Sequence, residues 1–462
     1  MDLERWLDEA VARHRTWTAG FGPYRAHPSL EITDERFAEA FAEFSDRLAD
    51  NYPFFHPRYA GQMLKPPHPA AMVGYLAAML VNPNNHALDG GPATARMERE
   101  VVEQLAQLFG YHNYLGHLTT SGTMANLEAL FVARELHPDK GIAYSDEAHY
   151  THRRMCGLLG VEGHAVPVDE LGRMDMQALH RLLGTGRIGT VVATAGTTGL
   201  GAIDAVHEVL AVARHYAVRV HVDAAYGGFF ALLADDDAAP EGLPSAPWRA
   251  IAECDSVVVD PHKHGLQPYG CGAVLFRDPA VGTFFLHDSP YTYFTSDELH
   301  LGEISLECSR AGAAAAAAWL TFRLLPPTRE GLGQVLAAGR RAALHWADLI
   351  DRSDRLRLYQ RPELDIVTYF PVGGSLTTLS AVDNAAALVL AEAMADPSDP
   401  VFLSTLRVTS QAFGLRAPDL TPDAEGARIL RSVLMKPESE FYVEQLHSGV
   451  EHFVHQVLSH AL

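Results

Sequence analysis

The spacing of large apolar side chains predicts helices in the first fifty residues. These side chains recur at about one helical turn and have charged residues between them: Trp6, Val11 and Ala12, then Phe37, Phe41 and Phe44. Helices of this kind pack one face against another surface. We therefore expect residues 1 to about 50 to make packing contacts rather than to carry chemistry.

Short apolar runs rich in β-branched residues predict strands further along the chain. Runs at 190–194, 220–223 and 256–259 alternate with segments of helical spacing. This alternation predicts an α/β fold with a mostly parallel sheet. Ligands bind at the carboxyl ends of parallel strands. Asp223 and Lys263 come at or just after the ends of two of these runs, so we expect them at the mouth of one crevice.

The sequence Pro326-Pro327 marks the predicted boundary of a second domain, because two prolines interrupt a helix. Beyond it, residues 331–352 have helical spacing, and strand-like runs follow near 364–370 and 405–411. This pattern predicts a smaller α+β domain. The predicted division is a helical segment with a pocket loop at 1–80, a large domain at 81–325 and a small domain at 326–462.

Composition narrows the classes of function. With 462 residues, 48% of them hydrophobic, the chain can bury a large core. A formal net charge of −21 argues against nucleic acid or an anionic membrane as partner, and no apolar run is long enough to span a bilayer. The N-terminus lacks the apolar core of a signal peptide. The four cysteines lack metal-ligand spacing, so we expect no metal site and a cytoplasmic protein with reduced thiols.

An acid and a lysine at neighbouring strand ends suit pyridoxal phosphate (PLP). This cofactor forms a Schiff base with a lysine, and an acid beside its pyridine nitrogen keeps that nitrogen protonated. Asp223 or Lys263 alone would fit an ordinary strand end or surface loop. The two together, with Gly227-Gly228 after the acid, favour the cofactor.

The segments around these two residues resemble a known family. His221-Val222-Asp223-Ala224-Ala225-Tyr226-Gly227-Gly228 and Asp260-Pro261-His262-Lys263 are similar to the group II PLP-dependent amino acid decarboxylases. That family includes the aromatic amino acid, glutamate, cysteine sulfinate and diaminobutyrate decarboxylases. The resemblance covers about Tyr52 to about Arg407. It implies an aspartate aminotransferase-like fold of type I, PLP as cofactor, and a homodimer with a shared active site.

The resemblance also implies which residues contact the cofactor. Ser121, Gly122 and Thr123 precede a helix predicted from Ala125, and helix N-termini bind phosphate. An ordinary serine N-cap explains the same residues equally well. Ser145-Asp146-Glu147-Ala148-His149 resembles the segment whose histidine stacks on the cofactor ring and takes part in proton transfer. The remaining implied cofactor contacts are Thr198 in preference to Thr197, Asp223, Ala225, His262 and Lys263.

The expected substrate contacts lie later in the chain. In the resembled family, a loop beyond the lysine carries a tyrosine that protonates the carbanion after CO2 leaves. Tyr291 and Tyr293 are the candidates here, with Tyr293 preferred for catalysis and Tyr291 for substrate binding. Arg407 is a candidate for binding the substrate carboxylate through two parallel hydrogen bonds. A surface ion pair is the alternative for Arg407.

The resemblance implies decarboxylation of an L-amino acid to an amine and CO2, with Lys263, His149, Asp223 and Tyr293 as catalytic residues. Aldol cleavage, transamination and aldehyde-forming oxidative decarboxylation use the same motifs and stay open. An inactive assembly partner and a nucleotide-binding dehydrogenase are further alternatives, although no GxGxxG follows a first strand. Aromatic residues and histidines between 54 and 68 favour an aromatic substrate, whereas Arg58, Lys65 and Arg96 suit an acidic one.

Overall fold

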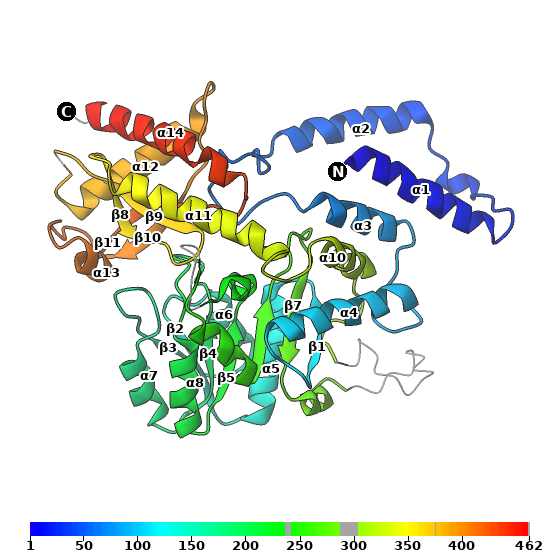
Figure 1. Ribbon diagram of the computed structural model, residues 1–462, viewed down its shortest axis with the longest axis horizontal. Helices are drawn as coiled ribbons and strands as arrows, with labels where there is room; N and C mark the ends of the chain where they lie inside the picture. The colour runs from blue at the N-terminus through cyan, green and yellow to red at the C-terminus, as the bar shows by residue number, and fades with distance from the viewer. Residues whose placement is uncertain (236–241, 287–303, 375, 461–462) are drawn as a thin grey trace.

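The structure is a computed structural model that describes residues 1–235, 242–286, 304–374 and 376–460. Figure 1 shows three parts: a large α/β unit, a smaller unit at the carboxyl end of the chain, and N-terminal helices that lie beside both. None of the helices in the described ranges combines the length and the apolar character that a membrane crossing requires.

The large unit is built on a seven-stranded sheet with the order β1-β7-β6-β5-β4-β2-β3. Only β7 runs antiparallel to its neighbours, which are β1 and β6. The other pairs are parallel, and Asp223 at the end of β5 lies opposite Val258 of β6. The strands are β1 Leu115–Thr119, β2 Gly141–Ser145, β3 Gly163–Val166, β4 Ile188–Thr194, β5 Arg219–Asp223, β6 Ser256–Val259 and β7 Gly272–Phe276.

Helices connect these strands and pack against the sheet. Strands β4 to β7 are buried along their whole length apart from Arg219 at the start of β5, as expected for strands covered on both faces. The helices of this unit are α3 Pro69–Met79, α4 Pro92–Leu108, α5 Gly122–Leu136, α6 Thr151–Leu159, α7 Met176–Leu183, α8 Val206–His215, α9 Ala246–Ala250 and α10 Gly312–Leu324.

The smaller unit is a four-stranded antiparallel sheet with the order β10-β11-β9-β8, covered by helices. Trp346 and Tyr369 are fully buried in its core. Its elements are α11 Leu332–Ile350, β8 Leu356–Gln360, β9 Ile366–Pro371, α12 Leu379–Ala395, β10 Ser404–Thr409, α13 Ser410–Arg416, β11 Gly426–Val433 and α14 Ser439–His460.

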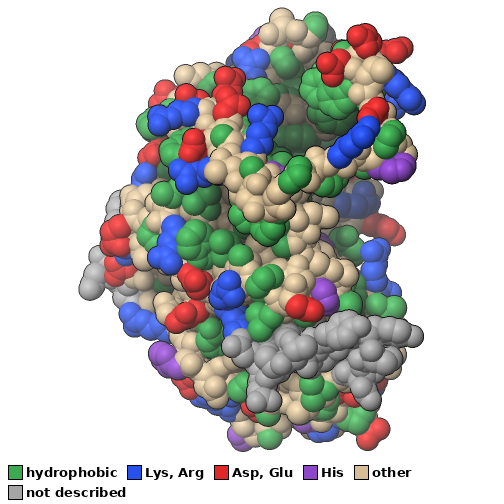
Figure 2. Space-filling view, turned by 90° about the vertical axis from the view of Figure 1, so that its right-hand side faces the viewer, with side chains coloured by type: hydrophobic (Ala, Val, Ile, Leu, Met, Phe, Trp, Pro, Cys, Tyr) green, Lys and Arg blue, Asp and Glu red, His purple; other side chains and the backbone are tan. Residues whose placement is uncertain are grey.

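Helices α1 (Leu3–Ala19) and α2 (Asp34–Ala49) precede both units, and neither contains a buried residue. Figure 2 looks from the side of these helices and shows hydrophobic side chains around a hollow at the top of the molecule. A cavity of about 590 Å³ lies where Trp17 of α1 faces α3, α4 and α10. The apolar faces of α1 and α2 are thus largely exposed in the single chain.

The structure confirms the mixed α/β fold predicted from the alternating pattern. Two local predictions were wrong: the helix expected from Ala125 begins at Gly122, and the strand expected to reach Gln411 ends at Thr409, where α13 follows. The predicted boundary at Pro326-Pro327 falls between α10 and α11. Ala60, predicted to belong to the N-terminal segment, is hydrogen-bonded to the small unit instead. Its N–H donates to Phe402 O, and its carbonyl accepts from Val433 N. The division into three segments therefore stays a prediction.

Candidate active site

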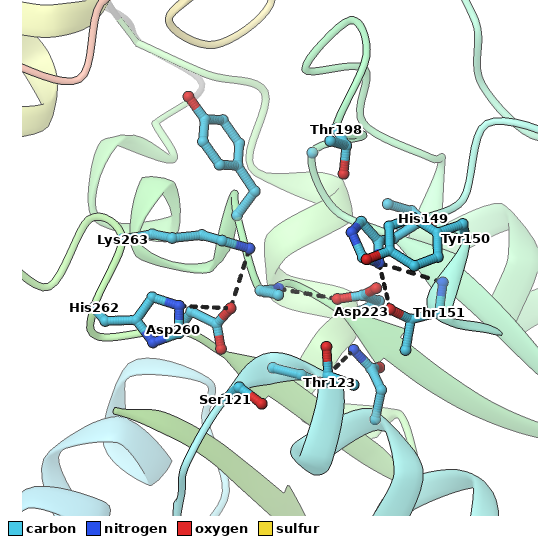
Figure 3. Close-up of a pocket in the computed structure, with 16 residues that line it drawn as sticks. Ser121, Thr123, His149, Tyr150, Thr151, Thr198, Asp223, Asp260, His262 and Lys263 are labelled. Atoms are coloured by element: carbon cyan, nitrogen blue, oxygen red, sulfur yellow. Dashed lines mark hydrogen bonds and ion pairs between the residues drawn. The ribbon is translucent and has the colours of Figure 1, made fainter. Parts of the chain in front are cut away.

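A pocket of about 230 Å³ lies at the carboxyl ends of β4, β5 and β6 (Figure 3). Nine residues predicted to contact a cofactor line it together: Ser121, Gly122, Thr123, His149, Thr198, Asp223, Ala225, His262 and Lys263. They come from five segments of the chain, and the parallel strands bring their loops to one edge of the sheet. Thr197 is not among the lining residues, and its hydroxyl instead accepts a hydrogen bond from Ala202 N.

Lys263 reaches into this pocket beside a buried carboxylate. Its Nζ lies 3.1 Å from Oδ2 of Asp260, and His262 Nε2 lies 3.5 Å from the same oxygen. Lys263 stands in the turn directly after β6, so the strand fixes the backbone position from which its side chain extends. The side chain of Lys263 is 21% exposed, against 3% for Asp260. Both residues line the pocket, and the amine is the more exposed of the two.

The first turn of α5 forms one wall of the pocket. Ser121 is the N-cap, and its hydroxyl accepts a hydrogen bond from Met124 N at 3.3 Å. The first backbone N–H groups of a helix have no acceptor within the helix, so those of Gly122 and Thr123 are free to bind an anion. A Cβ atom on Gly122 would come within 2.5 Å of Asp260 Oδ2. Only glycine lets the helix end approach the Lys263 loop this closely.

Asp223 is a buried carboxylate with a hydrogen bond on each oxygen. Oδ2 lies 2.7 Å from His152 Nε2, and Oδ1 accepts from Ala225 N at 3.1 Å. Burial by itself would raise the pKa of Asp223. The hydrogen bond from His152 and the nearby rings of His152 and His221 outweigh burial, so the pKa lies well below its usual range. Asp223 is therefore an anion at neutral pH.

His149 stands where the loop after β2 enters α6. Its Nδ1 accepts a hydrogen bond from Thr151 N at 3.3 Å and lies 2.5 Å from the Thr151 hydroxyl. Burial lowers the pKa of His149, and the positive charge of Lys263 also lowers it while Asp223 acts in the opposite direction. A neutral ring whose Nδ1 accepts carries its proton on Nε2.

These features fit PLP. The N-terminus of α5 offers backbone donors for the phosphate, Lys263 offers a primary amine for the aldehyde, and Asp223 offers an anion for the pyridine nitrogen. The hydroxyl of Thr194, which also lines the pocket, is buried and has no hydrogen-bond partner among the described residues. A polar ligand in the pocket would supply one.

Arg407 lies away from this pocket. It sits on β10 opposite Arg428 and is exposed. Its positive charge helps to lower the pKa of Asp383 on α12. Leu406, whose side chain points to the other face, contacts the backbone near Gly199. Side chains alternate along a strand, so this geometry directs Arg407 away from the large unit.

Sequence reasoning missed a second arginine. Arg431 of β11 is buried, and its guanidinium donates to Thr198 O at 2.7 Å and to Gly199 O at 3.0 Å. It also approaches Gly61 O at 3.4 Å. Arg431 therefore ties the small unit to the turn that carries Thr198. The position of Arg431 directly after the apolar pair Ile429-Leu430, in a run that continues with Val433-Leu434, is the signal that could have identified it.

Two predicted residues lie outside the described ranges, and sequence reasoning missed several residues that line the pocket. Tyr291 and Tyr293 belong to residues 287–303, which the structure does not describe. Asp260 was named only as part of the motif that contains Lys263 and was given no role, although it pairs with Lys263. His152 lies three residues after His149, and two histidines this close in the sequence could have suggested a shared role. The remaining lining residues missed from the sequence are Asn126, Tyr150, Thr151, Thr194, Gly196 and Tyr226.

Comparisons with known proteins point in the same direction. The family model described as "Pyridoxal-dependent decarboxylase conserved domain" matches residues 27–370. The L-tyrosine decarboxylase of Enterococcus faecium is 28% identical over an alignment of 493 residues, covering 82% of this chain and 80% of that protein. A probable L-tyrosine/L-aspartate decarboxylase of Methanothermobacter thermautotrophicus is 30% identical, covering 68% and 82%.

A solved structure agrees on the fold. The Oryza sativa protein titled "TDC with PLP and tryptamine" superposes with a TM-score of 0.79 at 18% identity, covering 98% of both chains. This likeness identifies the fold as type I, and the family match over 344 of 462 residues (27–370) identifies the cofactor and the chemistry. The chain belongs to the pyridoxal-dependent decarboxylases, lyases that use PLP to release CO2 from amino acids.

Proposed function

We propose that the substrate is an aromatic L-amino acid, with L-tyrosine as the first candidate and tyramine and CO2 as products. The observation that carries this proposal is an apolar cavity of about 680 Å³ next to the cofactor pocket. Its lining includes the aromatic residues Tyr52, Phe54, Phe55 and Tyr269. The ring of Tyr269 lies 4.9 Å from that of His262, which lines the cofactor pocket. Relatives named L-tyrosine decarboxylase support the same substrate.

Different residues of the pocket hold different parts of the cofactor in this proposal. Bound PLP supplies an electron sink for the bond between Cα and the carboxylate. The first turn of α5 holds its phosphate, with Ser121 and Thr123 adding hydroxyl donors. Lys263 Nζ is the amine that attaches it, and Asp223 holds a proton on its pyridine nitrogen. Ala225 is small enough for the ring to lie against the backbone.

His149 covers one face of the ring in this proposal and moves a proton. Its Nδ1 accepts from Thr151 N, so the proton on Nε2 faces away from that contact and is available for transfer. Delivery of this proton to Cα after CO2 leaves completes the amine. Tyr291 and Tyr293 are the alternative donors.

Arg431 takes the place proposed for Arg407 in recognising the substrate carboxylate. Its buried guanidinium holds the carbonyls of Thr198 and Gly199, and Thr198 lines the pocket. A planar guanidinium presents five N–H donors in a fixed fork, so one can meet the carboxylate while others hold the turn. The hydrogen bonds of Arg431 within the described residues go to uncharged oxygens, those of the Thr198, Gly199 and Gly61 carbonyls and the Ser404 hydroxyl.

The protein acts as a homodimer in this proposal, with a second copy covering the apolar faces of α1 and α2. Phe37, Phe41 and Phe44 are each more than 50% exposed, and the ring centroids of Phe37 and Phe41 are 5.9 Å apart. Exposed apolar stripes of this size mark association surfaces. A two-fold symmetric dimer would bury the same stripe on both copies.

We infer a reducing, cytoplasmic environment from the cysteines. Cys156, Cys254 and Cys271 are buried and unpaired, and burial raises the pKa of each thiol. Buried thiols of this kind are inert packing groups and are common where disulfides do not form.

The substrate proposal is tested by product analysis. The purified protein with PLP is incubated in air with L-tyrosine, L-tryptophan, L-phenylalanine, L-glutamate and L-aspartate, and products are identified by mass spectrometry. Tyramine with CO2 as the main product supports the proposal. β-Alanine from aspartate supports the second candidate, an acidic substrate, which the buried amine of Lys65 beside the aromatic cavity favours. An aldehyde with peroxide, or a keto acid, contradicts amine formation.

A further inference from the structure

His152 forms a hydrogen bond with Asp223, the carboxylate proposed above to pair with the pyridine nitrogen of PLP. It lies in the first turn of α6, is fully buried, and places Nε2 at 2.7 Å from Asp223 Oδ2. The other oxygen, Oδ1, accepts from Ala225 N. These two contacts come from different segments of the chain, so together they fix the plane of the carboxylate. His152 does not line the pocket itself.

The carboxylate partner defines which ring nitrogen of His152 donates. An ionised carboxylate can only accept, so Nε2 carries the hydrogen that Asp223 receives. Nδ1 is buried and has no hydrogen-bond partner among the described residues. The bond to Asp223 is therefore the one hydrogen bond of this ring among the described residues, and the ring of Tyr144 lies against it with the two centroids 6.1 Å apart.

A hydrogen bond at this place has a specific consequence. Burial of Asp223 favours its protonated form, and a protonated acid could no longer hold the proton of the pyridine nitrogen. The hydrogen bond from His152 Nε2 to Oδ2 favours the ionised form and offsets this effect of burial. The anion then remains available to the cofactor.

We propose that His152 is a positioning residue that keeps Asp223 ionised and oriented toward the pyridine nitrogen of PLP, and thereby sets the proton occupancy of that nitrogen. This inference rests on the role proposed above for Asp223. It adds to that role a residue that does not line the pocket and whose contribution passes entirely through one hydrogen bond.

The test uses holoenzyme prepared with PLP labelled with 15N at the pyridine nitrogen, whose NMR shift reports protonation directly. In the native protein we expect the shift of the protonated nitrogen. In His152→Leu and His152→Met the shift should move toward that of the unprotonated nitrogen, and PLP should dissociate about tenfold more readily, as expected for the loss of a hydrogen bond to a charged group. His152→Gln, whose amide is a neutral donor, should restore most of both values.

A matched control is available in the same unit. His117 of β1 is also fully buried, and its Nε2 lies 2.8 Å from Glu128, a carboxylate that does not line the pocket. His117→Gln should cost stability without moving the 15N shift. If both His152→Leu and His152→Met leave the shift and the PLP affinity unchanged while Asp223→Asn moves them, the role of His152 is wrong. If Asp223→Asn also leaves them unchanged, the role of Asp223 fails and the inference fails with it.

Discussion

The carboxylate of Asp260 lies between Lys263 and the first turn of α5. Its Oδ2 is 3.1 Å from Lys263 Nζ and would be only 2.5 Å from a Cβ atom on Gly122. A single buried acid thus sets both the direction of the lysine amine and the closeness of the helix end that is proposed to hold phosphate. The two halves of the cofactor site are coupled through this contact.

Gly122→Ala should weaken PLP binding, because the added methyl group collides with Asp260, which is buried and paired with Lys263. We expect at least a tenfold loss of affinity, corresponding to about 1.4 kcal/mol. Fluorescence titration of apoenzyme with PLP measures it. The control is Gly157→Ala on α6, where a Cβ meets open space and the helix gains about 0.5–1 kcal/mol. Equal affinities for the two variants would show that the close approach is unimportant.

Lys263→Ala should lower turnover by more than about a thousandfold, because it removes the amine proposed to attach the cofactor. The visible absorption of the bound cofactor should change at the same time, while far-ultraviolet circular dichroism stays native. Lys140→Ala, in the exposed turn before β2, is the control and should keep both activity and spectrum. A Lys263→Ala enzyme with full turnover would contradict the assignment.

Arg431→Met and Arg407→Met should behave differently. Loss of the buried Arg431 guanidinium removes the donor that holds the carbonyls of Thr198 and Gly199, at a cost of about 1–3 kcal/mol in total. It should also raise KM for the amino acid strongly. Arg407 is exposed, so its replacement should change stability by less than about 0.5 kcal/mol and leave KM unchanged. Urea unfolding and steady-state kinetics give both numbers, and the opposite ranking would restore Arg407 as the carboxylate ligand.

Lys65 should make stability depend on pH. Its Nζ is buried without a partner among the described residues, and burial lowers the pKa of Lys65 from 10.5 to about 7. Between these values the unfolded chain holds a proton that the folded chain has released, so this group adds stability as pH rises. Lys65→Met lacks the effect and should be more stable than the native protein near neutral pH.

The advantage of Lys65→Met should shrink by up to about 1.4 kcal/mol for each pH unit between pH 7 and the unfolded value. Urea unfolding of both proteins in parallel at several pH values measures the difference, and other titrating groups cancel in it. A difference that stays constant from neutral to alkaline pH would show that the amine is charged in the folded protein.

Phe41→Glu should dissociate the proposed dimer, because it places a charge in the exposed stripe of α2. Size-exclusion chromatography with light scattering should give the mass of one chain in place of two. Glu39→Gln changes a residue on the other side of the same helix and should leave the dimer intact. A native protein that is already monomeric, or a Phe41→Glu variant that stays dimeric, would contradict the interface.

The sequence by itself identified the residues that the pocket brings together on short segments. Asp223 and Lys263 end or follow apolar runs, and Ser121, Gly122 and Thr123 precede a helix. Parallel strands place their carboxyl ends at one edge of a sheet. Motifs at these strand ends therefore lie close together, independently of how the rest of the chain folds. This is why local patterns were sufficient for the fold class and for most of the pocket lining.

Only the tertiary structure decided between Arg407 and Arg431. Both lie on strands of the small unit, and alternation along a strand does not tell which face of the sheet meets the large unit. The packing of β11 against the turn at Thr198 gives that answer. The same holds for His152, because the sequence shows only that it lies three residues after His149, whereas the contact of α6 with the end of β5 brings it to Asp223. Contacts between distant segments follow from three-dimensional packing, which a local pattern does not encode.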